Sequence, residues 1–246
     1  MKLGSLLLIP TPLADPKTVT VETHTIALAS SQPPDVRTRI ANLTTFAVEN
    51  AKAARAFLKA NGTATPLQNL TLIEIGRALT DAALAPIIAA LKQGIDVGVL
   101  AEVGCPGIAD PGATLARAAH AISAPVVPLV GASSILLTLM ASGLNGQCFA
   151  FHGYLPIEAE PRIARIKSLE ARSLREKETE LFIETPYRNE ALCAALVATL
   201  KNDTWLTIAT DLSLSTETIQ TRKIRNWRGS SITYLAKRPS VFAFQA

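Results

Sequence analysis

Cysteines and long apolar runs are both scarce in this chain of 246 residues. The three cysteines, Cys105, Cys148 and Cys193, are odd in number, and their spacing matches neither a C-x-x-C pair nor a zinc site. No apolar run approaches the roughly 20 residues needed to cross a bilayer, and residues 6–9 are too few for the apolar core of a signal peptide. We therefore expect a cytoplasmic protein with no disulfide framework, no bound metal and no contact with a membrane.

Two widespread nucleotide-binding motifs are also missing. Neither G-x-G-x-x-G nor G-x-x-x-x-G-K-[ST] occurs, which disfavours a Rossmann dehydrogenase and a P-loop kinase. The formal net charge of +4 permits an anionic partner such as RNA but does not require one.

Apolar residues are abundant and fall in short runs. They make up 48% of the chain, and the mean hydropathy of +0.26 suits strands that are buried on both faces. The runs alternate with segments of helical spacing, which predicts an α/β fold with a mostly parallel sheet in the N-terminal half. The predicted strands there are 5–10, 44–48, 70–75, 95–101 and 125–129, and the predicted helices are 49–60, 82–92, 113–121 and 134–141.

The C-terminal half repeats this alternation more loosely, with polar segments that also resemble strands. A mixed sheet is therefore expected there, in a second domain. Domains are predicted over residues 1–135 and 136–246. The predicted strands are 149–154, 181–183, 205–210 and 240–244, with polar strand-like segments near 216–220 and 230–235, and the predicted helices are 162–177 and 188–200.

The segment from residue 99 to 112, V-L-A-E-V-G-C-P-G-I-A-D-P-G, is the most informative in the chain. A predicted strand leads directly into a loop with three glycines and two prolines. Ligands of open α/β sheets bind at the carboxyl ends of strands, where glycine lets the backbone approach them closely. This loop is therefore the first candidate for a small-molecule site.

Four further loops follow predicted strands, at residues 10–15, 130–134, 184–188 and 210–217. Small residues at a helix start, as in V-G-A-S-S, leave backbone N–H groups that can bind a carboxylate. Taken singly, each loop is better explained as an ordinary β–α turn, because glycine and proline are common there.

Six motifs in order make the chain similar to one known family: P-T-P-L, E-V-G-C-P-G-I-A-D-P-G, P-L-V-G-A-S-S, F-H-G-Y-L-P, E-T-P-Y-R and A-T-D-L-S-L. The set resembles the tetrapyrrole methylase superfamily of methyltransferases that use S-adenosylmethionine (SAM). Within it, the chain most resembles the ribosomal RNA small subunit methyltransferase I branch, which 2′-O-methylates a cytidine. The resemblance runs from about residue 6 to residue 244.

The resemblance implies a two-domain, tetrapyrrole-methylase-like fold, a homodimer, and SAM bound in the cleft between the domains. It also implies ribosomal RNA, or the small ribosomal subunit, as a partner. The residues that match cofactor-binding positions of the family are Pro12, Val103, Gly104, Cys105, Ile108, Ala132, Ser133, Ile183, Glu184, Leu212 and Pro239.

Methylation of a ribose hydroxyl requires that its proton leave, so a base within hydrogen-bonding reach would help. The acids that follow predicted strands are candidates, and Glu102 is the favoured catalytic residue. Asp110 is better explained by bonds within its own turn, and Glu184 by pairing with Arg188. For Cys105 a packing role is favoured, and for His152 a structural one.

The motifs depart from the RNA branch at residues 12–15 and 49–52, so two alternatives stay open. The acceptor could be a tetrapyrrole or another small molecule, or the protein could bind SAM without turnover. The basic residues at 162–177 alternate with glutamates, as on a solvated helix face. A less balanced group, Arg222, Lys223, Arg225 and Arg228 around Trp227, suits either RNA contact or a solubilising surface.

Overall fold

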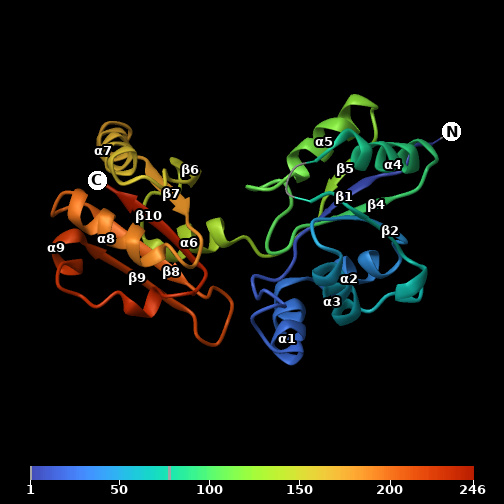
Figure 1. Ribbon diagram of the computed structural model, residues 1–246, viewed down its shortest axis with the longest axis horizontal. Coiled ribbons are helices and arrows are strands. Elements are labelled where there is room, and N and C mark those ends of the chain that lie inside the picture. The colour runs from blue at the N-terminus through green and yellow to red at the C-terminus, as the bar shows by residue number, and fades with distance from the viewer. Residues whose placement is uncertain (1, 77–78) are drawn as a thin grey trace. The chain divides into compact units, whose positions relative to one another are not determined.

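The computed structural model describes residues 2–76 and 79–246, and the chain divides into two compact units, Met1–Ser133 and Ser134–Ala246. Each unit has its own five-stranded sheet with helices packed on it (Figure 1). The α/β class is confirmed. The domain boundary between residues 135 and 136 stays a prediction.

The sheet of unit 1 has the strand order β3-β2-β4-β1-β5, and all its pairings are parallel among the described residues. Strands β2 and β4 are buried along their whole length and β1 is buried except at Leu8, which explains their near-continuous apolar sequence. The strands are β1 (Leu6–Ile9), β2 (Thr45–Val48), β3 (Thr71–Glu74), β4 (Val97–Leu100) and β5 (Val126–Pro128).

Helices cover both faces of this sheet (Figure 1). Alternate residues of a strand face opposite sides, so Leu7 packs against α1–α3 while Leu6 packs against α4 and α5. Side chains of Thr20, Asn50 and Thr80 accept hydrogen bonds at the starts of α1, α3 and α4. The helices are α1 (Val21–Ser31), α2 (Pro34–Ala41), α3 (Ala51–Asn61), α4 (Asp81–Lys92) and α5 (Gly112–Ala121), with a 3₁₀ turn at Leu67–Asn69.

The sheet of unit 2 is mixed, as predicted, with the order β6-β7-β10-β8-β9. Strands β6 and β7 are parallel, whereas β10 runs antiparallel to both of its neighbours. The strands are β6 (Phe149–Tyr154), β7 (Thr179–Ile183), β8 (Trp205–Thr210), β9 (Thr218–Lys223) and β10 (Ser240–Gln245).

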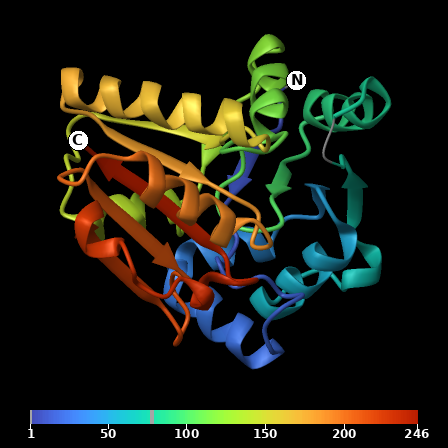
Figure 2. The same cartoon turned by 60° about the vertical axis from the view of Figure 1, so that its left-hand side comes forward.

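The main core of unit 2 lies on one face of this sheet, under α7, α8 and α9 (Figure 2). Phe182 stacks on Phe242 there, with ring centroids 6.0 Å apart, and both rings are fully buried. Helix α6 packs against β8, β9 and β10 from the other face. The helices are α6 (Ser134–Ser142), α7 (Ala159–Glu176), α8 (Asn189–Thr199) and α9 (Ile224–Trp227), with a 3₁₀ turn at Thr233–Leu235.

Two parts of the sequence prediction need correction. Helices α1 and α2 were not predicted, because few of their residues are apolar and buried, and neither was α9, which has only four residues. The segment 230–235 was predicted to resemble a strand, but it contains the 3₁₀ turn. Leu235 is fully buried and the turn contacts α8, so the chain folds back onto that helix rather than extending the sheet.

In the described part of the chain, no helix is both long enough and apolar enough to span a membrane.

The close packing of β4 yields a first prediction. A Cβ at Gly98 would lie 2.7 Å from side-chain atoms of both Ile9 and Phe46, whereas one at Gly146 would meet nothing within 4 Å. Gly98→Ala should therefore lower the free energy of unfolding by about 1–3 kcal/mol through overpacking. Urea titration of both variants measures this. A Gly98→Ala protein as stable as Gly146→Ala would contradict the described packing.

Candidate functional site

The carboxyl ends of β4, β1 and β5 lie side by side at one edge of the sheet of unit 1, because these strands are adjacent and parallel. The loops after β1 and β4 are joined by an antiparallel bridge between Thr11 and Gly104. Thr11 N–H donates to the Gly104 carbonyl at 2.9 Å, and Gly104 N–H donates back at 3.3 Å. Gly104 has φ +81°, a conformation that favours glycine.

The loop after β5 joins the same group. The Cys105 thiol donates to the carbonyl of Ala132 at 3.2 Å. At Gly131 a Cβ would lie 2.4 Å from the Pro10 ring, so only glycine allows this approach of the loops after β5 and β1. The structure thus brings together the predicted site residues of unit 1: Pro12, Val103, Gly104, Cys105, Ile108, Ala132 and Ser133.

Asp110 organises the loop after β4 from within. Its Oδ1 accepts hydrogen bonds from the N–H groups of Gly107 at 2.6 Å and Gly112 at 2.7 Å. The turn role predicted for Asp110 is confirmed. Burial raises the pKa of the Asp110 carboxyl above its ordinary value of 3.8, and the two backbone hydrogen bonds oppose that rise.

The loop after β4 exposes two apolar side chains beside the charged side chain of Glu102. Val103 and Ile108 are 39% and 52% exposed, while Pro12 and Gly104 are buried. Burial also raises the pKa of the Cys105 thiol, although a hydrogen bond with Ser133 opposes this. The thiol therefore stays protonated near neutral pH, which suits the predicted packing role rather than a nucleophile.

Two side chains anchor the loop after β1, one from helix α1 and one from the residue that caps the C-terminal end of this helix. The sequence alone identified neither. The Gln32 amide donates to the Pro10 carbonyl, and both are buried. His24 Nδ1 lies 3.0 Å from the Ala14 carbonyl oxygen. No motif marked either residue, since their partners lie in another segment of the chain.

Glu102, the favoured catalytic residue, stands at the end of β4 and pairs with the loop after β1. Its carboxylate lies 2.7 Å from the Lys17 ammonium, and the two side chains are 37% and 46% exposed. Its backbone N–H also donates to Glu49 at 3.4 Å. A pair this exposed adds little stability, about 0–1 kcal/mol, and leaves the carboxylate accessible to a ligand.

The remaining predicted site residues meet at one edge of the sheet of unit 2. The carboxyl ends of β7 and β8 lie there on either side of the start of β10. Ile183 is opposite Val241, and the Asp211 N–H donates to the Pro239 carbonyl at 3.0 Å. This edge therefore collects Ile183, Glu184, Leu212 and Pro239.

Ion pairs fill this second edge. The buried Glu184 carboxylate accepts from Arg188 at 2.6 Å, so the predicted pairing is confirmed. The buried Asp211 carboxylate accepts from Arg238 at 2.8 Å and from the Thr216 hydroxyl at 2.7 Å. Both acids are engaged in holding their loops, which leaves Glu102 as the more accessible acid.

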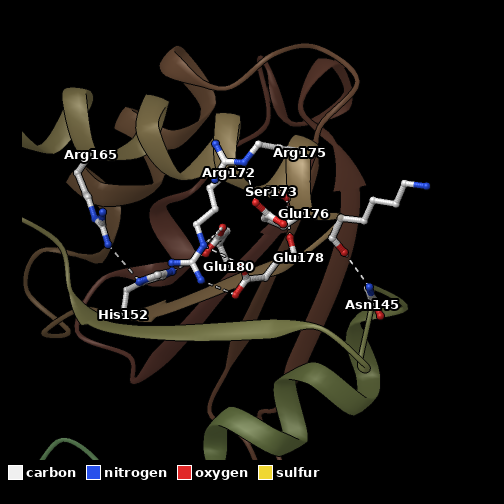
Figure 3. Close-up of polar contacts among 10 residues, drawn as sticks. Asn145, His152, Arg165, Arg172, Ser173, Arg175, Glu176, Glu178 and Glu180 are labelled. Atoms are coloured by element: carbon white, nitrogen blue, oxygen red, sulfur yellow. Dashed lines mark hydrogen bonds and ion pairs between the residues drawn. The ribbon is translucent and has the colours of Figure 1, made fainter.

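His152 belongs to a separate polar cluster under helix α7 (Figure 3). It hydrogen-bonds the fully buried Glu180 through Nε2, and the Arg165 guanidinium lies 3.2 Å from its Nδ1. Arg172 from the same helix binds Glu178 through two hydrogen bonds, at 2.8 and 2.9 Å. These contacts tie α7 to β6 and β7, which agrees with the structural role predicted for His152.

Solved structures define the class of fold. The methyltransferase CobJ superposes with a TM-score of 0.58 and 17% identity over 88% of each chain. The uroporphyrin-III-C-methyltransferase from Thermus thermophilus gives 0.53 and 15%, covering all of this chain and 93% of the other. The chain thus has the two-domain α/β fold of these methyltransferases, as predicted.

Comparison by sequence shows similarity to a more specific group of methyltransferases. Ribosomal RNA small subunit methyltransferase I of Synechocystis sp. is 31% identical over 150 residues, and that of Haemophilus influenzae 30% over 142. The matches cover 61% and 58% of this chain but about half of each relative, 50% and 49%. No family model matches the chain. The sequence similarity to ribosomal RNA small subunit methyltransferase I that the six motifs predict is therefore confirmed.

The raised pKa of Asp110 predicts a specific pH dependence. The Asp110 carboxyl has a higher pKa in the folded protein than in the unfolded chain, so the folded protein binds this proton more tightly. The free energy of unfolding therefore falls as pH rises from about 3.8 through the folded pKa. Asp110→Asn keeps the accepting Oδ1 without titrating, so wild type should lose stability relative to this variant across that window. Denaturant unfolding at several pH values measures the difference.

Asp110→Ala provides the matched comparison. It removes the acceptor as well as the charge, leaves the N–H groups of Gly107 and Gly112 without their partner, and should cost about 1–3 kcal/mol. Equal stabilities of the Asn and Ala variants would contradict the turn role.

Proposed function

We propose that this protein is a SAM-dependent methyltransferase that 2′-O-methylates ribose in small-subunit ribosomal RNA. The observation that carries the proposal is the joining of three strand-end loops in unit 1 by the Thr11–Gly104 bridge and the Cys105–Ala132 hydrogen bond. Similarity to ribosomal RNA small subunit methyltransferase I over 150 residues supports the same reading.

The residues of this edge fit SAM. Glycine at position 104 lets the backbone come close to a ligand, and the exposed side chains of Val103 and Ile108 offer apolar contact to its amino-acid part and ribose. Ala132 and Ser133 would contact the cofactor from the loop after β5. When bound, SAM supplies an electrophilic methyl group, so the protein has mainly to position and orient the reactants.

Glu102 is proposed to accept the proton of the ribose hydroxyl. Its carboxylate is accessible, and the Lys17 ammonium 2.7 Å away holds it in one orientation. The cofactor contacts predicted for Ile183, Glu184, Leu212 and Pro239, a homodimeric assembly and a cytoplasmic location belong to this proposal as well.

SAM binding can be measured separately from methyl transfer. Wild type should bind SAM in calorimetry at concentrations below about 1 mM. Ile108→Asp should weaken binding by about tenfold or more, because it replaces an apolar contact with the cofactor by a charge. Ile26→Asp is a matched control, since Ile26 is 62% exposed on α1. Absence of SAM binding by wild type at millimolar concentration would refute the proposal.

Methyl transfer tests the acceptor and the base together. With labelled SAM, wild type should methylate unmodified small ribosomal subunits at a ribose 2′-oxygen. Glu102→Ala should slow transfer by about 10²–10⁴-fold with little change in SAM affinity, because only the positioned base is lost. Glu176→Ala removes an exposed acid that is also paired with a cation at 2.7 Å, and should retain the wild-type rate.

Each outcome of the transfer assay has one meaning. Transfer by Glu102→Ala at a near wild-type rate would exclude Glu102 as the base. Transfer to a tetrapyrrole but not to ribosomal subunits would replace the RNA acceptor with a small molecule. SAM binding with no transfer to either acceptor would favour a protein without turnover.

A further inference from the structure

The end of the β8–β9 hairpin combines cations with an exposed aromatic ring. Trp205, the first residue of β8, is 44% exposed, and the Lys223 ammonium lies 5.5 Å from its ring centroid. Across the hairpin end, the Arg222 guanidinium lies 5.0 Å from the ring centroid of Trp227, which is buried. Arg222 and Lys223 are neighbours in β9, and neighbouring residues of a strand face opposite sides. The two cations therefore lie on opposite faces of the sheet at this end of the hairpin.

The charge of this surface is only partly balanced. A single carboxylate, Asp203, serves both Lys223 at 3.1 Å and Arg225 at 2.8 Å. Within residues 2–76 and 79–246, neither Arg222 nor Arg228 forms an ion pair with a carboxylate. Four cations therefore stand against one acid, and an anionic partner would complete the charge balance.

Helix α7 has more arginines and lysines than the β8–β9 end, but some of them are paired with glutamates. Arg172 pairs with Glu178, and Arg175 pairs with Glu176. Two of its five cations are thus paired with glutamates, and the helix has three acids of its own, as expected of a solvated helix face. Residues 222–228, R-K-I-R-N-W-R, carry four cations and no acid, so positive charge is denser at the β8–β9 end than on α7.

Strand β9 is an edge strand, so this surface is not covered by a further strand of the described sheet. An extended polyanion could run along it, with its charges spaced to meet Lys223, Arg225 and Arg228. An exposed indole beside such a track is the feature that single-stranded nucleic acids use for base stacking. A folded protein partner would need a broad apolar face, which Trp205 alone does not provide.

We infer that the β8–β9 end is a docking surface for a single-stranded segment of RNA, whose phosphates contact Lys223, Arg225 and Arg228 while one base stacks on Trp205. Lys223 has a flexible stem, so its ammonium can move from the indole to a phosphate as the base arrives. The inference rests on the proposed function for its choice of RNA, and it adds a contact surface outside the residues assigned to the cofactor and to proton transfer.

The phosphate contacts are tested by Arg225→Gln/Arg228→Gln. The probe is small-subunit ribosomal RNA transcribed in vitro, titrated at several salt concentrations without SAM. The double variant should bind about tenfold more weakly at low salt, and the slope of log affinity against log salt should fall by about 1.4, or about 0.7 per lost contact. Lys167→Gln/Arg175→Gln removes the same charge from exposed positions of α7 and should bind as wild type does.

The stacking contact is tested by Trp205→Ala, which should weaken binding by about 5- to 150-fold without changing the salt slope. Trp205→Phe keeps an aromatic face and should restore most of the affinity. Phe149→Ala is the matched control, because Phe149 begins the opposite edge strand β6 and is 40% exposed. Thermal unfolding confirms that each variant is folded before its affinity is compared.

Unchanged affinity and salt slope in Arg225→Gln/Arg228→Gln would overturn the inference and leave a solubilising surface. Equal losses in the α7 control would also overturn it, because net charge alone would then explain binding. Wild-type affinity for duplex DNA equal to that for the RNA would exclude single-stranded docking. Absence of SAM binding refutes the proposed function by a separate measurement, since the RNA titrations contain no cofactor.

Discussion

The Thr11–Gly104 bridge is the constraint on which the candidate site depends. Loops after two parallel strands are free to diverge, but two reciprocal backbone hydrogen bonds, at 2.9 and 3.3 Å, join these loops in antiparallel fashion. The positive φ of Gly104 allows the chain to turn at the bridge. Cys105 is thereby carried to the carbonyl of Ala132, and the third loop becomes part of the same surface. One pair of backbone contacts thus determines which side chains can meet a ligand.

The two units stabilise their strand-end loops by different means. Unit 1 uses backbone and turn contacts, including those of Asp110, and exposes the apolar side chains of Val103 and Ile108. Unit 2 uses carboxylate–guanidinium pairs, Glu184–Arg188 and Asp211–Arg238. Because a buried charge is costly without its partner, the acids of unit 2 are held in these pairs. Because Glu102 is exposed and these acids are buried in ion pairs, Glu102 is the acid proposed for proton transfer.

Charged side chains likewise serve two purposes in unit 2. Beneath α7, His152 and Glu180 are part of a satisfied cluster that connects the helix to the sheet. At the β8–β9 end, four cations share one acid, Asp203, around an exposed indole. Helix α7 has more arginines and lysines, but its own glutamates and two ion pairs offset part of that charge. The distribution of partners, rather than the number of arginines and lysines, decides where a polyanion would bind.

What the sequence by itself determined is the local order of the chain: the central strands, most helices, the turn at Asp110 and the set of strand-end loops. These features depend on contacts a few residues apart, so short patterns of apolar residues, glycine and proline predict them. Only the tertiary structure decided which distant residues meet. Gln32 lies 22 residues from Pro10, and Lys17 lies 85 residues from Glu102. Helix α1 escaped prediction for the same reason, since it is defined by what it packs against more than by its own sequence.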